Sequence, residues 1–266
     1  MTRARLAAWV VAAATAIAAS PARAQAPSAG EAPSVATQGV AAADPARWLP
    51  GVISASAASA LAIGTAWAGY DSATHTPLTG AATEVRLGRR VVLGAGATYA
   101  ARDDQEPAAL RPSALVRVQV LDQPSHGLDL DVAAGYRQDR FSGEDGLFEA
   151  TVALGVRGDA GGVVLNLGYG MDGEGDDQLG EARLVTFRRL ASALHVGLDG
   201  HIQWLFDSSD PNRDLHSTPT LALSVMPVMT YGAGPVTLLV EAGWSGVDRG
   251  GFRNGLLALA GAGTAF

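Results

Sequence analysis

The sequence predicts an all-β protein that forms a transmembrane antiparallel up-and-down β-barrel of twelve strands. The first observation is an alternation of period two that lasts through long stretches. In residues 127–140 the even positions from Leu128 to Tyr136 are apolar, and most odd positions are polar or glycine. The pattern recurs in residues 146–158 and 162–172. Such alternation predicts strands, and runs of about 9–11 residues with one apolar face are typical of tilted strands that cross a membrane.

Twelve candidate strands follow the segment Trp48-Leu-Pro-Gly51. Their ranges are 59–70, 78–88, 90–101, 111–122, 127–140, 146–158, 162–172, 180–191, 193–206, 218–231, 235–246 and 255–266. The first range, which contains SASAASALAIG, could also start as a short helix. The alternative architecture is therefore a barrel of ten strands in which residues 51–88 form a plug or a periplasmic element.

The second observation is that the connections between these strands alternate in length. Short turns such as 88–90 and 158–162 alternate with longer polar loops such as 102–110 and 207–218. Outer-membrane barrels have short periplasmic turns and longer extracellular loops. The alternation therefore predicts that the short turns are periplasmic, and an even number of strands then places both termini in the periplasm.

The amino terminus has the pattern of a cleaved signal peptide. Arg3 and Arg5 precede an apolar run, Leu6–Ala19, and Ala22-Arg-Ala24 forms a small-x-small cleavage site. The following residues are rich in Ala, Pro and Ser, which is typical of a flexible linker. We therefore expect a signal peptide at 1–24, a flexible periplasmic leader at 25–50 and the barrel at 51–266.

Composition excludes several classes of function. The chain has no cysteine, which excludes a disulfide, a cysteine-zinc site and a thiol nucleophile. Its net charge of −7 disfavours nucleic acid as a partner. No residue pattern indicates a cofactor or a metal site, and the sequence leaves open whether the protein has any enzymatic activity.

Aromatic residues are predicted to form two girdles at the membrane interfaces. Each strand that runs outward carries a Trp or Tyr near its outer end, on the parity of its apolar side, and Phe148 joins this outer girdle, whereas Tyr231 and Phe266 fall at the periplasmic level. Amphipathic rings prefer the headgroup region of a bilayer. The predicted girdle residues are Trp67, Tyr99, Tyr136, Phe148, Tyr169, Trp204, Tyr231, Trp244 and Phe266.

The signal peptide, the series of hairpins and the last strand, LLALAGAGTAF, which ends at Phe266, together resemble the Gram-negative outer-membrane β-barrel superfamily. The resemblance points to no particular member. It implies an outer-membrane location, with contacts to membrane lipid and lipopolysaccharide. It also implies that the outer-membrane assembly machinery recognises the strand that ends at Phe266.

The other parity of the strands supplies the predicted lumen-lining residues. They are Glu84, Arg86, Arg117, Asp129, Asp131, Arg137, Glu149, Arg157, Arg183, His195, Asp199, His201 and Glu241. Both signs of charge are present, with acids in excess. One interpretation is a narrow passive channel for small polar solutes with a modest preference for cations. The alternative is a structural or envelope-assembly barrel whose lumen is closed by paired charges.

A third hypothesis is a hydrolase that uses lumen residues. His195, Asp199 and His201 lie at i, i+4 and i+6 of one strand and therefore face the same side. Asp199-Gly-His201 and Asp129-Leu-Asp131 resemble the water-activating pairs of the omptin outer-membrane proteases. In this sequence the two pairs fall at different depths, whereas in that family they meet at the extracellular rim.

Overall fold

The structure is a computed structural model, and it describes residues 45–53, 62–100, 109–138, 146–173, 177–208, 220–248 and 251–265. The predicted signal peptide, the leader up to residue 44 and Phe266 lie outside the described residues. Among the residues described, no helix has the length and apolar character needed to cross a membrane.

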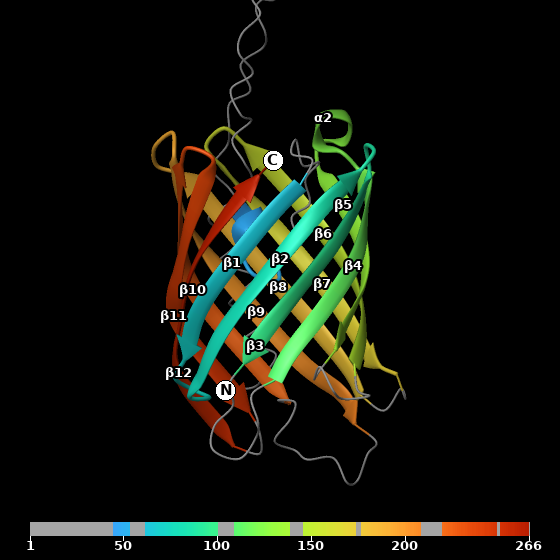
Figure 1. The fold of residues 1–266 in the computed structure, drawn as a ribbon, viewed down its shortest axis with the longest axis vertical. Helices are drawn as coiled ribbons and strands as arrows, with labels where there is room; N and C mark the ends of the chain where they lie inside the picture. Colours follow the sequence, from blue (N-terminus) through green and yellow to red (C-terminus); the bar gives the residue numbers. More distant parts are fainter. Residues whose placement is uncertain are drawn as a thin grey trace, which may run out of the picture. The chain divides into compact units, whose positions relative to one another are not determined.

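Twelve antiparallel strands form a closed barrel (Figure 1), which confirms the predicted fold class. Their bounds are β1 (Ala62–Asp71), β2 (Thr76–Leu87), β3 (Val91–Ala100), β4 (Ala109–Leu121), β5 (Asp129–Gln138), β6 (Gly146–Gly158), β7 (Gly161–Asp172), β8 (Asp177–Arg189), β9 (Leu194–Ser208), β10 (Leu221–Ala233), β11 (Val236–Asp248) and β12 (Phe252–Ala265). The ten-strand alternative is wrong, because β1 and β2 are both strands of the barrel wall.

The first and last strands close the barrel. β1 pairs with β12 from Ile63 opposite Ala265 to Asp71 opposite Leu257, and its other edge pairs with β2. Every strand therefore has two neighbours, and no edge is left without hydrogen-bonding partners.

The outer surface of the barrel is apolar. Large apolar side chains on alternate positions are exposed, for example Leu87 (49%), Val156 (52%) and Leu256 (68%). A soluble protein rarely exposes so continuous an apolar surface. An apolar band on outward-facing positions is what a membrane-spanning barrel requires.

Short connections lie at one end of the barrel, which we call the short-turn end. Gly88 and Gly234 each have a positive φ, of 69° and 64°, in the turns after β2 and β10. The connection between β4 and β5 contains the helical turn α2 (Gln123–His126) and ends at Gly127, which adopts the left-handed conformation. We call the opposite end the long-loop end.

A segment that precedes the first strand lies inside the barrel. It comprises the 3-10 turn η1 (Pro45–Trp48) and residues 49–53, and we call it the plug segment. Its apolar side chains join inward-facing residues of the wall in one buried cluster. The cluster contains Ala46, Leu49, Val52, Val164, Val185, Val228 and Leu239, with Phe187 packed against it.

The plug segment corrects the sequence analysis, which assigned residues 45–50 to a flexible leader. Trp48 and Leu49 are 5% and 4% exposed. The wall makes room for the Trp48 ring at Gly263, where a β-carbon would lie 2.3 Å from Trp48 Cε3. Burial of these two side chains favours binding of the segment in the lumen. The Ala-, Pro- and Ser-rich composition of the leader as a whole did not indicate it.

Candidate functional site

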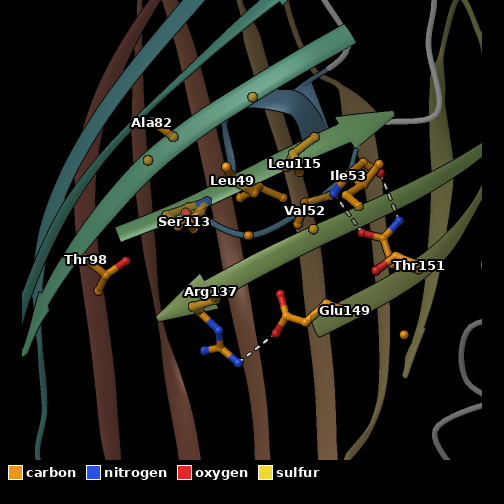
Figure 2. A pocket seen from close by; sticks show the side chains of 18 of the residues that line it. Leu49, Val52, Ile53, Ala82, Thr98, Ser113, Leu115, Arg137, Glu149 and Thr151 are labelled. Atoms are coloured by element: carbon orange, nitrogen blue, oxygen red, sulfur yellow. Dashed lines mark hydrogen bonds and ion pairs between the residues drawn. The ribbon is translucent and has the colours of Figure 1, made fainter. Parts of the chain in front are cut away.

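The lumen contains a cavity of about 560 Å³. Its lining consists of part of the plug segment together with inward-facing residues of strands β1 to β9 (Figure 2). Small and hydroxyl-bearing residues form much of the wall, including Gly96, Ser113, Thr151 and Gly168. The volume lies within the range of small-molecule sites, about 300–1,000 Å³.

One charged pair faces the cavity from β5 and β6. Arg137 Nη2 donates to Glu149 Oε1 at 2.8 Å, and their side chains are 34% and 35% exposed. The two residues come together because the register of β5 and β6 places Arg137 opposite Leu147, next to Glu149 on the same face. Their partial exposure means that solvent reaches this part of the lumen.

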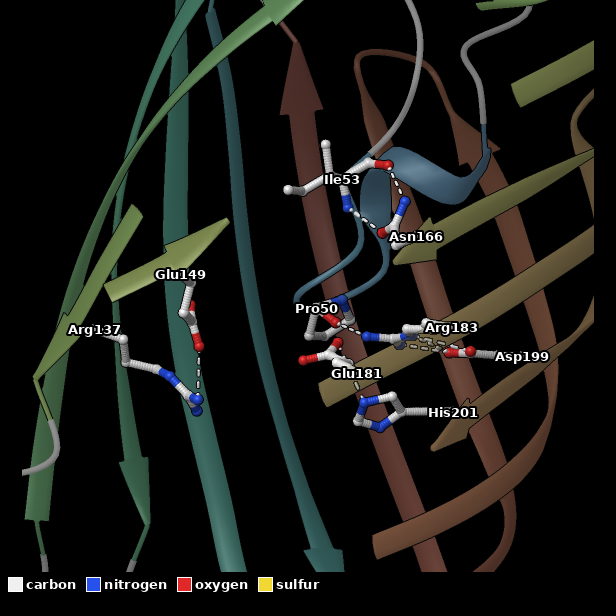
Figure 3. Close-up of polar contacts among 9 residues, drawn as sticks. All are labelled: Pro50, Ile53, Arg137, Glu149, Asn166, Glu181, Arg183, Asp199 and His201. Carbon is white, nitrogen blue, oxygen red and sulfur yellow. Dashed lines mark hydrogen bonds and ion pairs between the residues drawn. The ribbon is translucent and has the colours of Figure 1, made fainter. Parts of the chain in front are cut away.

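A second pair faces the cavity from β8 and β9. His201 Nε2 lies 3.2 Å from Glu181 Oε1 (Figure 3). Figure 3 shows that this pair and the Arg137–Glu149 pair come from different parts of the wall. Both signs of charge therefore face the same water-accessible space.

A buried ion pair lies beside the Glu181–His201 pair, on the same two strands. Arg183 Nε donates to both carboxylate oxygens of Asp199, at 3.0 and 3.1 Å. Asp199 is fully buried and Arg183 nearly so. A buried charge is costly unless it is paired. Each of these two side chains therefore stabilises the ionised form of the other.

The plug segment is held by side chains of the wall. Asn166 Oδ1 accepts a hydrogen bond from Ile53 N–H at 2.8 Å, and Asn166 Nδ2 donates to the Ile53 carbonyl oxygen at 2.9 Å. Arg183 Nη1 donates to the Pro50 carbonyl oxygen at 2.5 Å (Figure 3). The guanidinium of Arg183 therefore binds both Asp199 and the plug segment.

A separate network lies toward the short-turn end. Arg117, which is 1% exposed, donates to Glu84 at 3.0 Å and lies 3.5 Å from Asp131. Arg157 donates to Asp129. The Asp129 carboxylate also accepts from the main chain of Gln123 at 2.8 Å, which connects α2 to the wall. The charged side chains in that part of the lumen are therefore paired with one another.

The remaining predicted lumen residues have different surroundings. Arg86 donates to the Arg89 carbonyl oxygen at 2.9 Å near the short-turn end. The ring of His195 lies 6.4 Å from that of Phe187 in an edge-on arrangement. Glu241 is fully buried, and neither of its carboxylate oxygens has a hydrogen-bond partner among the described residues.

The structure does not assemble the hydrolase constellation. Asp199 is bound to Arg183, and the acidic partner of His201 is Glu181. Asp129 and Asp131 are bound to arginines of the other network. In the part of the chain that the structure describes, no three acidic or histidine side chains are arranged to hold a metal ion.

Trp67 corrects the predicted outer girdle, because its side chain lines the cavity. It shares parity with the buried Ile63, and the outward aromatic of β1 is Tyr70, which is 46% exposed. The indole packs over Gly80, where a β-carbon would lie 2.5 Å from Trp67 Cζ2. Alanines on the outer face of β1 left the sequence without a contrast between its two faces.

The other described aromatic residues that were predicted on the lipid side occupy outward-facing positions. They are Tyr99, Tyr136, Phe148, Tyr169, Trp204, Tyr231 and Trp244. Two of them, Tyr136 and Phe148, pack with ring centroids 5.1 Å apart across β5 and β6. Phe206, which the sequence analysis did not include, packs on Trp204 at 5.4 Å.

Sequence reasoning missed the residues that anchor the plug segment. Asn166 has the lumen-facing parity of its strand, but nothing in the periodicity indicates Ile53 as its partner, and Pro50 was placed in the leader. A signal was present in the chain. The stretch Trp48-Leu-Pro-Gly-Val-Ile53 is the first concentration of large apolar residues after an Ala-, Pro- and Ser-rich segment.

Comparison with solved structures finds other barrels. A NanC porin structure matches with a TM-score of 0.58 and 13% identity, covering 76% of this chain and 100% of that chain. The translocator domain of the autotransporter NalP from Neisseria meningitidis matches with a TM-score of 0.44 and 12% identity, covering 77% and 87%. The outer membrane protease OmpT from Escherichia coli matches with a TM-score of 0.32 and 12% identity, covering 78% and 94%.

No protein-family model and no curated protein matches the sequence. At these identities the structural likeness extends to the fold alone. The chain thus shares the fold of a porin, a closed antiparallel β-barrel, and no particular family is identified.

Proposed function

We propose that this protein is an integral outer-membrane barrel that acts as a narrow passive channel for small polar solutes. The observation that supports the proposal best is the cavity of about 560 Å³, which is lined by small, hydroxyl-bearing and charged residues. Eight strands leave an interior that side chains can fill, and sixteen or more leave an aqueous channel. A barrel of twelve strands falls between these limits. The match to a structure named as a porin agrees with a channel, although it extends to the fold alone.

The proposed channel selects weakly by charge. Arg137 and Glu149 neutralise each other at 2.8 Å, and Glu181 lies beside His201. The charges that face the cavity are therefore mostly paired, so a solute meets both signs rather than a ring of one sign. Any preference for cations is expected to be modest.

The second candidate function is a structural or assembly barrel with a closed lumen. The plug segment and the network around Arg117 and Asp129 favour it, because together they occupy the lumen toward one end. The two functions differ in one measurable property, the ion current through the purified barrel.

The test is single-channel recording in planar bilayers with a salt gradient. We expect the full-length barrel to conduct weakly, and a variant that lacks residues 45–53 to conduct several times better with a reversal potential near zero. Swelling of liposomes in small sugars and amino acids then gives the size limit for solutes. A plug-free variant that folds but carries no current would refute the channel and favour the closed barrel.

We also propose that the short-turn end faces the periplasm. The short turns support this orientation by analogy with bacterial barrels. Four arginines lie at or next to the short turns, at a level where they would meet lipid headgroups: Arg89, Arg90, Arg188 and Arg189. Protease digestion of intact cells tests the orientation, since extracellular short turns would be cleaved without cell lysis.

A further inference from the structure

The side chain of Asn166 holds the main chain of the plug segment through two hydrogen bonds. A carboxamide that accepts from an N–H and donates to the C=O of the same residue reproduces the pairing that a neighbouring strand makes. Asn166 does this with Ile53, at 2.8 and 2.9 Å. Neither contact involves the Ile53 side chain, so the site recognises backbone.

Arg183 extends the same site by one more main-chain contact. It donates to the Pro50 carbonyl oxygen at 2.5 Å while its other nitrogens bind Asp199. The ion pair fixes the direction of the guanidinium, which leaves one N–H group aimed at the peptide. Residues 50 and 53 are thus bound at two points three residues apart, with Val52 packed in the apolar cluster between them.

Glu241 opposes the bound state. Its cross-strand partner Val228 and its lumen-side neighbour Leu239 both belong to the apolar cluster that the plug segment completes. Glu241 is fully buried there, and both of its carboxylate oxygens lack hydrogen-bond partners in the described residues. A buried carboxylate without hydrogen bonds is strongly unfavourable. Removal of the cluster's plug residues would let water reach it.

We propose that residues 45–53 are a releasable plug, bound in the lumen by Asn166 and Arg183 and destabilised there by Glu241. The favourable contacts and the buried carboxylate offset each other, so the bound and released states differ little in free energy. Release exchanges the peptide contacts for hydration of Glu241. This equilibrium does not require the barrel to conduct, and it can be measured independently of any current.

The chain offers a direct probe, because it contains no cysteine. Val52→Cys in the full-length protein places a single thiol in the buried cluster, where Val52 is 8% exposed. A membrane-impermeant maleimide then labels the thiol only when the plug has left the lumen. Leu49→Cys, at a position 4% exposed, serves as a second reporter if the first perturbs folding.

Three further substitutions, each made in the Val52→Cys protein, test the proposal. Asn166→Ala removes two hydrogen bonds and should raise the labelling rate roughly tenfold or more. Glu241→Leu removes the unsatisfied carboxylate and should lower the rate roughly tenfold. Gln203→Ala is the matched control, since this amide lines the same cavity but makes no hydrogen bond to residues 45–53. Heat-modifiable migration on gels verifies that each barrel is folded.

The outcomes separate cleanly. Labelling of Val52→Cys as fast as that of a thiol in the 159–160 turn would overturn the plug itself. An unchanged rate in Asn166→Ala would overturn the peptide site. An unchanged or raised rate in folded Glu241→Leu would overturn the role given to Glu241. A plug that is released as expected from a barrel that never conducts would leave this inference intact and refute the channel.

Discussion

The Asn166 side chain pairs with the main chain of Ile53 as an adjacent strand would, through one accepted and one donated hydrogen bond. The end of the plug segment, which belongs to no strand, can therefore lie in the lumen without leaving these backbone groups unsatisfied. The inward-facing position of Asn166 on β7 and the apolar cluster beside it make the same wall suitable for both the backbone and the side chains of the plug segment.

Loss of Arg183 should destabilise the barrel strongly. In Arg183→Met the fully buried Asp199 loses the partner that binds it at 3.0 and 3.1 Å. Breaking one side of a buried ion pair costs about 3–5 kcal/mol. We expect a lower denaturant midpoint for unfolding in detergent micelles, followed by the heat-modifiable shift on gels.

The control for this prediction replaces both partners. The double variant Arg183→Met, Asp199→Leu contains no unpaired charge at the site, and apolar replacement of a whole buried pair is often neutral or stabilising. Its midpoint should recover most of the loss. A double variant as unstable as the single one would mean that packing, rather than the unpaired carboxylate, accounts for the effect.

Two lumen-facing glycines should differ in their tolerance of a methyl group. At Gly197 a β-carbon would lie 1.9 Å from the Thr186 carbonyl oxygen, whereas at Gly168 the nearest atom is Glu181 Cβ at 3.4 Å. Gly197→Ala should therefore cost about 1–3 kcal/mol, and Gly168→Ala should change stability by less than about 0.5 kcal/mol. Denaturant midpoints measure both, and equal values would show that β8 and β9 do not approach as closely as described.

The strand pattern was predictable because each strand has two chemically different environments. In β6 the outward-facing Phe148 and Val152 alternate with the inward-facing Glu149 and Thr151. The alternation itself therefore indicates lipid on one side of the strand and the lumen on the other. β1 lacks this contrast, because alanine and glycine occupy most of its outer face while the apolar Ile63 and Trp67 lie on its inner face. The prediction of which face is outward therefore failed at Trp67, although the strand itself was predicted correctly.

The site was less predictable, because its partners are far apart in the sequence. Arg183 and Asp199 are both lumen-facing by parity, but their pairing depends on the register between β8 and β9. Asn166 and Ile53 are separated by 113 positions, and Ile53 belongs to no strand. Periodicity indicates which face a side chain occupies, but it does not indicate which neighbour completes its hydrogen bonds.

The orientation of Trp67 can be tested by fluorescence. The chain has five tryptophans, and variants that retain Trp67, Trp204 or Trp244 as the sole tryptophan can be folded into vesicles whose acyl chains carry bromine. Bromine quenches indoles in direct contact with lipid. We expect quenching of Trp204 and Trp244 and little quenching of Trp67, which lines the cavity. Strong quenching of Trp67 by the acyl chains would restore the girdle position that the sequence analysis assigned to it.

The two faces of β6 provide a test of the whole register from adjacent residues. Val152 faces outward and is 39% exposed, while Thr151 lines the cavity. An arginine in contact with lipid near the middle of a barrel strand costs about 2–4 kcal/mol. Val152→Arg should therefore lower the free energy of unfolding in lipid vesicles by that amount.

The matched variant Thr151→Arg places the same side chain one residue earlier on the strand, in a cavity that already contains Glu149 and Glu181. A wet lumen with carboxylates nearby can hydrate and pair the new guanidinium, so its cost should be small beside that of Val152→Arg. Unfolding of both variants by denaturant in the same vesicles gives the comparison. If Thr151→Arg were the more destabilising of the two, the inward and outward faces of β6 would be exchanged, and the pairing of Arg137 with Glu149 across β5 and β6 would fail with them.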